Sequence, residues 1–406
     1  MKKAALALLS CLILLANCAL ADRGAPEIIL ESQPKQACTA VIRCAGDFVI
    51  HDNLLASAQK VGGGKYAFAQ MMEEIGEYMG EADFTFTNVD GVMGTEEFGR
   101  KYGYKGYPSF STPPSLIYDL KDIGVDLLTL ANNHAIDYWY DGLISTVTSV
   151  KNAGLYSVGG YRSLAEKQTP CIVDINGIAI GFLNYTDGLN QMDKRRALDK
   201  AALEYGVDFL EYANVPADIQ RLKDAGAELI VCYMHWGIEY RKEPCNSQKS
   251  NAAMLAKAGV DVIIGGGPHM VQRAEYITTT DAAGKPKKVL CLYSLGNFLS
   301  DQRGKGKDCG IIFDFTVTRD EDGVVTVSDP CYRTTWVWRR QSGSTFAYSI
   351  LFSDNVTARP DRMSEKDYNR MLESARETYD RMKQGCAKLA VAKEETEAII
   401  AAPSRR

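Results

Sequence analysis

Apolar stretches of strand length alternate with amphipathic segments of helix length along most of the chain. Four helix-like segments end at a glycine, and each glycine leads into an apolar run. Glycine adopts the left-handed conformation that closes a helix, so each one marks a helix-to-strand junction. The junctions are Gly124 before residues 125–130, Gly154 before 155–158, Gly226 before 227–233 and Gly259 before 260–264. This alternation predicts an α/β protein built from βα units around a largely buried sheet.

Further apolar runs predict additional strands, and one pair of them forms a hairpin. These strands are expected over residues 40–45, 84–87, 172–175, 178–183 and 289–295. Asn176-Gly177 lies between two of the runs and is typical of a tight hairpin turn, so part of the sheet is antiparallel. The mixture favours a sandwich of two sheets with helices outside over a simple doubly wound sheet.

The first residues differ in character from the rest of the chain. Two lysines precede an apolar run over residues 4–16, and a small-residue stretch follows that ends at Ala21. This order is typical of a secretory signal peptide over residues 1–21, and it predicts an exported protein that is extracellular or associated with the cell envelope. A lipid anchor at Cys18 is the alternative, and the Ala19-x-Ala21 pattern favours cleavage after Ala21.

Three segments are expected after the signal peptide. Residues 22–38 form a linker, 39–304 form the main domain, and 305–406 form a C-terminal appendage. In the appendage, residues 310–318 and 324–328 alternate like a hairpin, and a charged helix begins near Asp367.

Net charge limits the possible binding partners, and cysteine spacing limits the possible metal sites and disulfides. The formal net charge is -5, and removal of two signal-peptide lysines would make the remainder more acidic. This mild acidity argues against nucleic acid as a partner, because phosphate backbones require basic patches. No CxxC spacing occurs, which argues against a zinc-thiolate site. Cys44, Cys232 and Cys291 lie in apolar runs and are expected to be buried, whereas cysteines in more polar context, such as Cys331, could pair.

Polar side chains follow several predicted strands at the point where each strand ends. They are Asp47 and His51; Asn88 and Asp90; Asn133, His134 and Asp137; His235 and Glu239; His269; and Asn297. Open α/β sheets bind their ligands at the carboxyl ends of the strands. Carboxylates, imidazoles and an amide oxygen that converge there suit a divalent ion such as Mn, Fe or Zn. The sequence therefore predicts a divalent-metal site that includes all four histidines.

Several of these residues also have a purely structural interpretation. Asp47 could cap the segment that follows, and Asp90 could belong to a turn with Gly91. His51 taken alone is more typical of a structural histidine, and Asn297 of a turn residue. Asp137, Glu239 and Asn88 are candidates for groups that orient the metal ligands.

Six motifs in order resemble those of the CapA family of poly-γ-glutamate capsule biosynthesis proteins. The motifs are residues 46–47, 88–91, 130–138, 235–240, 268–272 and 293–298, and the resemblance covers about Thr39 to Arg303. That family is similar to the calcineurin-like metallophosphoesterases. The resemblance implies a four-layer αββα sandwich around a centre of one or two divalent ions.

The resemblance also implies a role for each motif residue. Asp47 would bind the first metal, Asp90 would be the bridging acid and Asn133 would bind the second metal. His134 would lie beside the substrate as a catalytic group that stabilises charge or protonates a leaving group. The list of implied metal ligands is completed by His235 and His269.

Two departures from the family pattern bear on the metal count. Asp90 stands where the family usually has Glu, and Gly266 and Gly267 stand where it commonly has histidines. A site without those imidazoles would hold one ion firmly and the second weakly, or use water in its place.

Three functions are compatible with this sequence. The first is a metal-dependent hydrolase or transferase that acts on a phosphoester or γ-glutamyl amide of an anionic envelope polymer. The second is a non-catalytic protein that binds poly-γ-glutamate and cooperates with membrane-bound capsule synthesis proteins. The third is a surface phosphatase unrelated to capsule. Polymer binding would need a cationic patch, for which Arg43, Arg273 and Arg303 are candidates.

Overall fold

The computed structural model describes residues 36–190, 204–211, 213–281, 283–356 and 358–390. The expected signal peptide, Cys18 and most of the expected linker lie outside the described residues. Among the residues that are described, no helix combines the length and the apolar character needed to span a bilayer.

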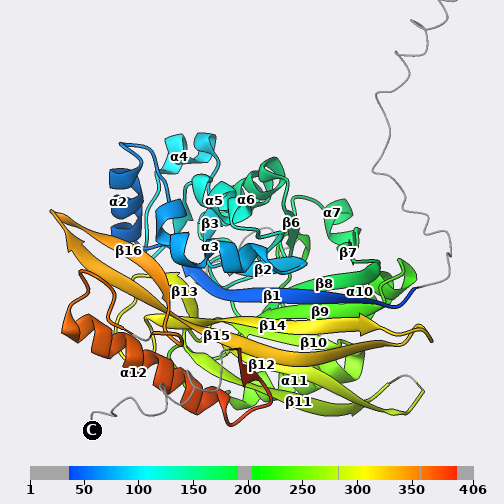
Figure 1. Ribbon diagram of the computed structural model, residues 1–406. Helices are drawn as coiled ribbons and strands as arrows, with labels where there is room; N and C mark the ends of the chain where they lie inside the picture. Colours follow the sequence, from blue (N-terminus) through cyan, green and yellow to red (C-terminus); the bar gives the residue numbers. More distant parts are fainter. Residues whose placement is uncertain (1–35, 191–203, 212, 282, 357, 391–406) are drawn as a thin grey trace, which may run out of the picture. The chain divides into compact units, whose positions relative to one another are not determined.

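Two large sheets form the centre of the described chain (Figure 1). The larger sheet has the order β16 (Thr345–Phe352), β15 (Val325–Ser342), β14 (Cys309–Arg319), β1 (Cys38–Val49), β2 (Phe84–Val89), β5 (Leu127–Thr129) and β6 (Tyr156–Val158). Two short strands also join it, β13 (Asn297–Ser300) beside β1 and β17 (Lys388–Leu389) beside β15. Strands β1, β2, β5 and β6 run parallel, whereas β14 is antiparallel to β1.

The smaller of the two large sheets also has a parallel centre. Its order is β11 (Val271–Thr280), β12 (Pro286–Leu295), β10 (Val262–Gly266), β9 (Leu229–His235), β8 (Ile178–Thr186) and β7 (Ile172–Ile175). Strands β8, β9, β10 and β12 are parallel, and β7 and β11 are antiparallel edges. A separate pair, β3 (Val92–Met93) and β4 (Ser111–Thr112), lies outside both sheets.

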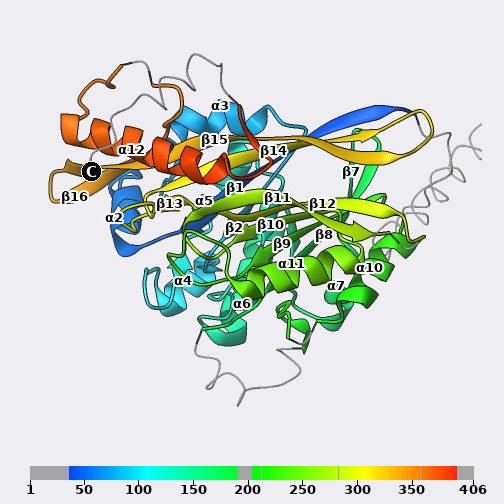
Figure 2. The ribbon, with the colours of Figure 1, turned by 90° about the horizontal axis from the view of Figure 1, so that it is seen from below.

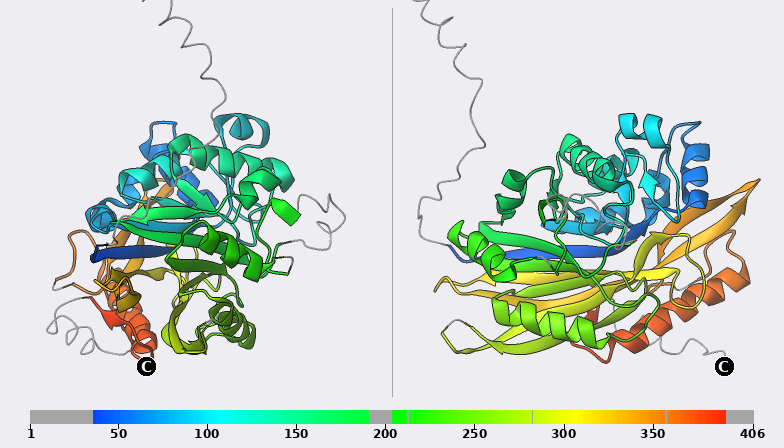
Figure 3. Two further views of the ribbon diagram at one scale, coloured as in Figure 1. Left: turned by 90° about the vertical axis from the view of Figure 1, so that its right-hand side faces the viewer. Right: turned by 180° about the vertical axis from the view of Figure 1, so that it is seen from behind.

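Helices cover the outer face of each sheet. The helices are α2 (Asp52–Val61), η1 (Ala69–Met71), α3 (Glu73–Gly80), α4 (Glu96–Tyr102), α5 (Ser115–Asp122), α6 (Trp139–Ala153), α7 (Leu164–Gln168), α10 (Val215–Asp224), α11 (Asn246–Ala258) and α12 (Glu365–Met382). Figure 1 shows α2, α3, α5 and α6 on one side of β1 and β2, and Figure 2 shows α10 and α11 beside the smaller sheet. Figure 3 shows α12, in red, along β15 and β11, which it contacts.

Apolar cores fill the spaces between these layers. One core lies between the sheets and includes Ile42 and Val231, which are both buried. A second joins the larger sheet to its helices through residues such as Leu54 and Leu143, and a third joins the smaller sheet to α11 through Leu255. Within the described residues the layers therefore run helix, sheet, sheet, helix. This confirms the predicted four-layer αββα sandwich.

The local predictions of helix ends and turns are confirmed. All four junction glycines have positive φ angles, and Gly154 closes α6 in the left-handed conformation. Asn176 and Gly177 connect β7 to β8 in the predicted hairpin, both with positive φ. The helix expected from Asp367 is α12.

The segment after residue 304 is not the appendage that the sequence suggested. The expected hairpin exists as β14 and β15, but β14 pairs with β1 over residues 38–45 and lies within the larger sheet. The described residues from Gln36 onward, those of the C-terminal segment included, belong to one compact unit. The physical reason is that β14 is buried on both faces, with Ile311, Ile312 and Phe313 all inaccessible to solvent.

The described cysteines include buried residues, and none of them is paired. Cys44, Cys232 and Cys291 are fully buried, as expected. Within the described chain, all cysteines, Cys331 included, are free thiols.

Candidate metal centre

Polar side chains from both sheets converge where parallel strands end. Asp47 lies at an irregularity of β1, where it pairs with Asn297 of β13, and His235 ends β9. Ligand atoms of Asp47, Asp90 and His235 all lie within 4.8 Å of one another, and the three residues are buried. Three residues far apart in the sequence therefore lie together and form one candidate site.

Both carboxylate oxygens of Asp47 accept hydrogen bonds. Its Oδ1 accepts hydrogen bonds from Asn88 Nδ2 at 2.8 Å and from the Tyr233 hydroxyl at 3.0 Å. Its Oδ2 accepts from the backbone N–H of Gly267 at 3.0 Å. Burial acts to raise the pKa of Asp47, but the contact with His269 and the charges of both nearby histidines lower that pKa to about 2. Asp47 is thus an ionised, fixed carboxylate.

The carboxylate of Asp90, unlike that of Asp47, lacks hydrogen-bond partners among the described residues. Its side chain is buried, yet neither carboxylate oxygen has a hydrogen-bond partner among the described residues. The nearest cationic group is His269, whose Nε2 lies 3.8 Å from Asp90 Oδ2. The amide oxygen of Asn133 is also buried without a partner in the described chain. Native proteins rarely leave buried acceptors unsatisfied, so these oxygens fit the ligands of a cation.

His269 is oriented by a hydrogen bond and held in an unusual backbone conformation. Its Nδ1 donates to Asn297 Oδ1 at 3.0 Å and lies 3.5 Å from Asp47 Oδ2. The φ angle of His269 is 55°, a left-handed value that is uncommon for a residue other than glycine. Burial lowers the pKa of His269, but Asp47 and Asp90 outweigh it and raise the pKa to about 9 in the metal-free protein. The fold therefore directs Nε2 of this imidazole toward Asp90.

His134 forms a separate pair with Asp137 beside the metal-facing residues. The Nδ1 of His134 donates to Asp137 Oδ2 at 2.6 Å, and Asn190 Nδ2 lies 3.0 Å from His134 Nε2. Asp137 also accepts from the backbone N–H of Phe110, whose ring edge contacts His134. Burial lowers the pKa of His134, but Asp137 and the charge of Asp90 raise it overall. This arrangement favours the protonated form of His134 relative to a free imidazole.

Two other predicted residues lie at the margin of the site. His51 contacts the backbone oxygen of Val49 through Nδ1 and packs its ring against Phe110. Glu239 is exposed in the segment after β9, and its charge contributes to the raised pKa of His269. Neither residue contributes to the group formed by Asp47, Asp90 and His235.

The three arginines suggested as a polymer-binding patch are engaged elsewhere. Arg43 is buried and forms two hydrogen bonds with Asp314. Arg273 pairs with Glu243 and Glu275, and Arg303 donates to the backbone oxygen of Val337. A cation nearer the site is Lys307, whose Nζ lies 3.7 Å from the centre of the Tyr240 ring. The Tyr240 ring is in turn 6.2 Å from that of His269.

Sequence reasoning missed two residues that contact the site. Tyr233 lies two residues before His235, so period-2 alternation places both side chains on the same face of β9. That alternation could have identified Tyr233. Asn190 follows β8 in an irregular segment, and no local signal pointed to its contact with His134.

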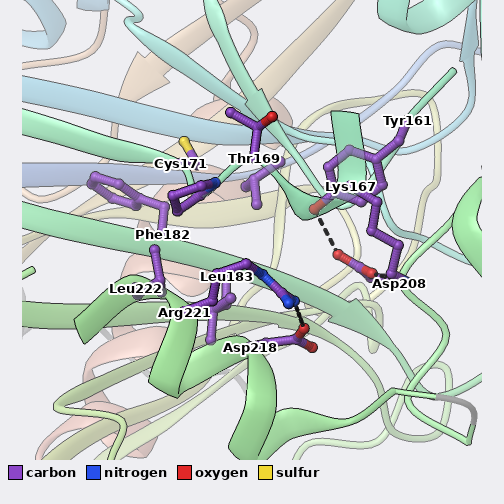
Figure 4. A pocket seen from close by; sticks show the side chains of 12 residues that line it. Tyr161, Lys167, Thr169, Cys171, Phe182, Leu183, Asp208, Asp218, Arg221 and Leu222 are labelled. Atoms are coloured by element: carbon purple, nitrogen blue, oxygen red, sulfur yellow. Dashed lines mark hydrogen bonds and ion pairs between the residues drawn. The ribbon is translucent and has the colours of Figure 1, made fainter. Parts of the chain in front are cut away.

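A pocket distinct from these residues lies near β6, α7 and α10 (Figure 4). Lys167 Nζ is 3.0 Å from Asp208 Oδ1, and the Tyr161 hydroxyl donates to Asp208 Oδ2 at 2.7 Å. Arg221 and Asp218 form a second ion pair. The charged groups that line this pocket are thus paired with one another. The strand-end site, with its unsatisfied acceptors, is the stronger candidate for binding a ligand.

The residues of the strand-end site fit a divalent ion. Asp90, Asp47, His235 and His269 together offer carboxylate and imidazole donors, a mixture that Mn, Fe and Zn accept, and the unpartnered amide oxygen of Asn133 is a further candidate donor. A bound divalent ion supplies Lewis-acid chemistry that activates water and screens an anionic substrate.

The chain is similar in sequence to curated capsule biosynthesis proteins. The chain is 26% identical over 241 residues to the capsule biosynthesis protein CapA of Bacillus anthracis, a match that covers 59% of this chain and 55% of that protein. It is 31% identical over 188 residues to the PGA biosynthesis protein CapA of Bacillus subtilis (strain 168), covering 45% of this chain and 44% of that protein. The chain thus spans about half the length of the curated relatives it matches.

A solved structure and a family model complete the comparison. The NAD nucleotidase NadN of Haemophilus influenzae superposes with a TM-score of 0.43 at 13% identity, covering 90% of this chain and 60% of that chain. Residues 41–302 match the family model described as bacterial capsule synthesis protein PGA_cap. Because this match covers most of the chain, the protein belongs to the PGA_cap family of bacterial capsule synthesis proteins.

Proposed function

We propose that this protein is an exported cell-envelope protein that acts on poly-γ-glutamate, or a related anionic polymer, through a divalent-metal centre. The reaction would be hydrolysis or transfer at a phosphoester or γ-glutamyl amide bond during synthesis, export or processing of the polymer. Membership of the capsule synthesis family supports the substrate class. The N-terminal pattern of residues 1–21 supports export.

The observation that carries the metal centre is the environment of Asp90. A buried carboxylate without a hydrogen-bond partner is strongly unfavourable unless a cation compensates its charge. Asp47 and His235 lie within ligand distance of the same point, and His269 directs Nε2 toward it. These residues would hold one ion between the two sheets.

The remaining polar residues would bind and orient the substrate. His134, held by Asp137, would stabilise developing negative charge or donate a proton to the leaving group. Lys307, beside Tyr240, would attract the anionic polymer toward the centre.

A direct test uses purified protein that has been loaded with Mn²⁺ and given poly-γ-glutamate and a panel of phosphoesters. Turnover should require the metal and should be lost in the Asp47→Ala and His235→Ala variants. Turnover that persists in a chelator would contradict the proposal. The matched control is Asp208→Ala, which removes a buried carboxylate in the separate pocket and should leave turnover intact.

A non-catalytic binding role is the second candidate, and one observation favours it. Gly266 and Gly267 contribute no side chain to the centre, which leaves fewer ligands than the motif pattern of the family implies. In that case poly-γ-glutamate should bind to the chelator-treated protein with unchanged affinity, and no ester or amide should be cleaved.

A further inference from the structure

The Tyr233 hydroxyl occupies space beside Gly266 in the interior of the candidate metal centre. Tyr233 is among the largest fully buried side chains of the described residues. A Cβ atom placed on Gly266 would lie only 2.0 Å from the Tyr233 hydroxyl and 2.6 Å from Asp47 Oδ1. A larger residue at position 266 is therefore incompatible with Tyr233 in its observed position.

The strand register explains why these two residues meet. On adjacent parallel strands, Gly266 of β10 pairs with His235 of β9, and Tyr233 lies two residues before His235 on the same face. Gly267, the next residue, has a φ angle of 100°, and a Cβ there would lie 2.8 Å from the backbone oxygen of Trp236. Positions 266 and 267 therefore have no room for a metal-binding side chain while Tyr233 and Trp236 keep their observed positions.

The same hydroxyl limits the capacity of Asp47 to bind cations. A carboxylate has about four lone-pair sites for donors or metal ions. Asn88, Tyr233 and the N–H of Gly267 occupy three of those sites on Asp47, which leaves about one for an ion. Asp90, by contrast, has both oxygens without partners in the described chain. The strongest position for an ion is therefore on the Asp90 side of the centre.

We propose that Tyr233 is a positioning residue that fixes Asp47 and restricts the centre to one firmly bound divalent ion. This inference rests on the metal centre of the proposed function. It adds the residue that fixes Asp47 and limits the number of firmly bound ions.

The first test is Mn²⁺ binding to the full-length purified protein, measured by calorimetry and by electron paramagnetic resonance. We expect one tightly bound Mn²⁺ per chain with the six-line spectrum of an isolated ion. Two ions of similar affinity, or the spectrum of a spin-coupled pair, would overturn the inference. Failure to bind any Mn²⁺ would instead refute the metal centre itself, so the two failures are distinguishable.

The second test compares two Tyr→Phe variants that each remove one buried hydroxyl. Tyr233→Phe should weaken Mn²⁺ binding by about 10- to 100-fold, the usual effect of removing a group that orients a metal ligand. Tyr185→Phe is the matched control, because the Tyr185 hydroxyl donates to Asp218 at 2.8 Å, away from the centre. Equal Mn²⁺ affinity in wild type and Tyr233→Phe would overturn the positioning role. A visible Fe³⁺ absorption band that disappears in Tyr233→Phe would also overturn it, since that band requires direct ligation by the phenolate.

The third test examines the steric relation between the two residues and is independent of metal. Gly266→Ala should lower the thermal stability of the chelator-treated protein, and adding Tyr233→Phe should recover part of the loss. Additive losses in the double variant would contradict the close contact. If Gly266→Ala alone does not fold, recovery of folded protein in the double variant gives the same answer.

Discussion

Asp90→Asn should change stability in opposite directions with and without metal. In the metal-free protein the Asp90 carboxylate is buried and has no hydrogen-bond partner among the described residues, and His269 Nε2 lies 3.8 Å from its Oδ2. Leaving a buried polar group unsatisfied costs about 1–3 kcal/mol, and more if the group is charged. The asparagine amide stays buried and loses the attraction to His269. We therefore expect a net gain of about 1–2 kcal/mol in the free energy of unfolding.

When metal is bound, Asp90→Asn should be less stable than wild type. Wild-type protein at a free metal concentration about 1,000 times its Kd gains about 4 kcal/mol, because only the folded state binds the ion. Asp90→Asn should lose most of that gain. Urea denaturation in chelator and in excess Mn²⁺ measures both effects on the same samples.

A control variant, Asp126→Asn, tests whether removing a carboxylate elsewhere in the protein has the same effect on stability as Asp90→Asn. Asp126 accepts a hydrogen bond from the Thr85 backbone N–H at 2.8 Å, so Asp126→Asn should destabilise the protein in both conditions. If Asp90→Asn is less stable than wild type in chelator, or is stabilised by Mn²⁺ as much as wild type, the interpretation of Asp90 as a metal ligand is wrong.

Three further predictions follow from the titratable groups and the N-terminus. The pKa of His269 is raised from 6.5 to about 9 in the metal-free protein. Protonated His269 therefore stabilises that protein fully below pH 6.5, and this stabilisation is lost as pH rises through about 9. A free energy of unfolding that stays constant over that pH range in denaturation experiments would contradict the prediction. Asp137→Asn should lower the pKa of His134, shift the alkaline limb of the pH–rate profile to lower pH and reduce turnover about 10- to 100-fold. Mass spectrometry of protein exported by its native host should show cleavage after Ala21, and an acylated Cys18 would establish the lipoprotein alternative.

Much of the fold and site follows from local sequence patterns. Glycine at helix ends located the junctions before β5, β6, β9 and β10, because closing a helix requires a positive φ that glycine adopts without strain. Polar residues directly after buried strands pointed to Asp47, Asp90 and His235, which lie close together because parallel strands end at a common edge.

Contacts between distant segments were not predictable in this way. Strand β14 pairs with β1 across more than 260 residues, and only its burial on both faces distinguishes it from a surface hairpin. The approach of Tyr233 to Gly266 depends on the register of β9 and β10, which neither strand reveals alone.

The most direct test of the metal centre is the Mn²⁺ content of purified protein after loading and removal of free ion. We expect retained Mn²⁺ in wild type and none in His235→Ala, whose imidazole belongs to the buried group with Asp47 and Asp90. A folded wild-type protein that retains no Mn²⁺, Fe²⁺ or Zn²⁺ under these conditions would contradict the account.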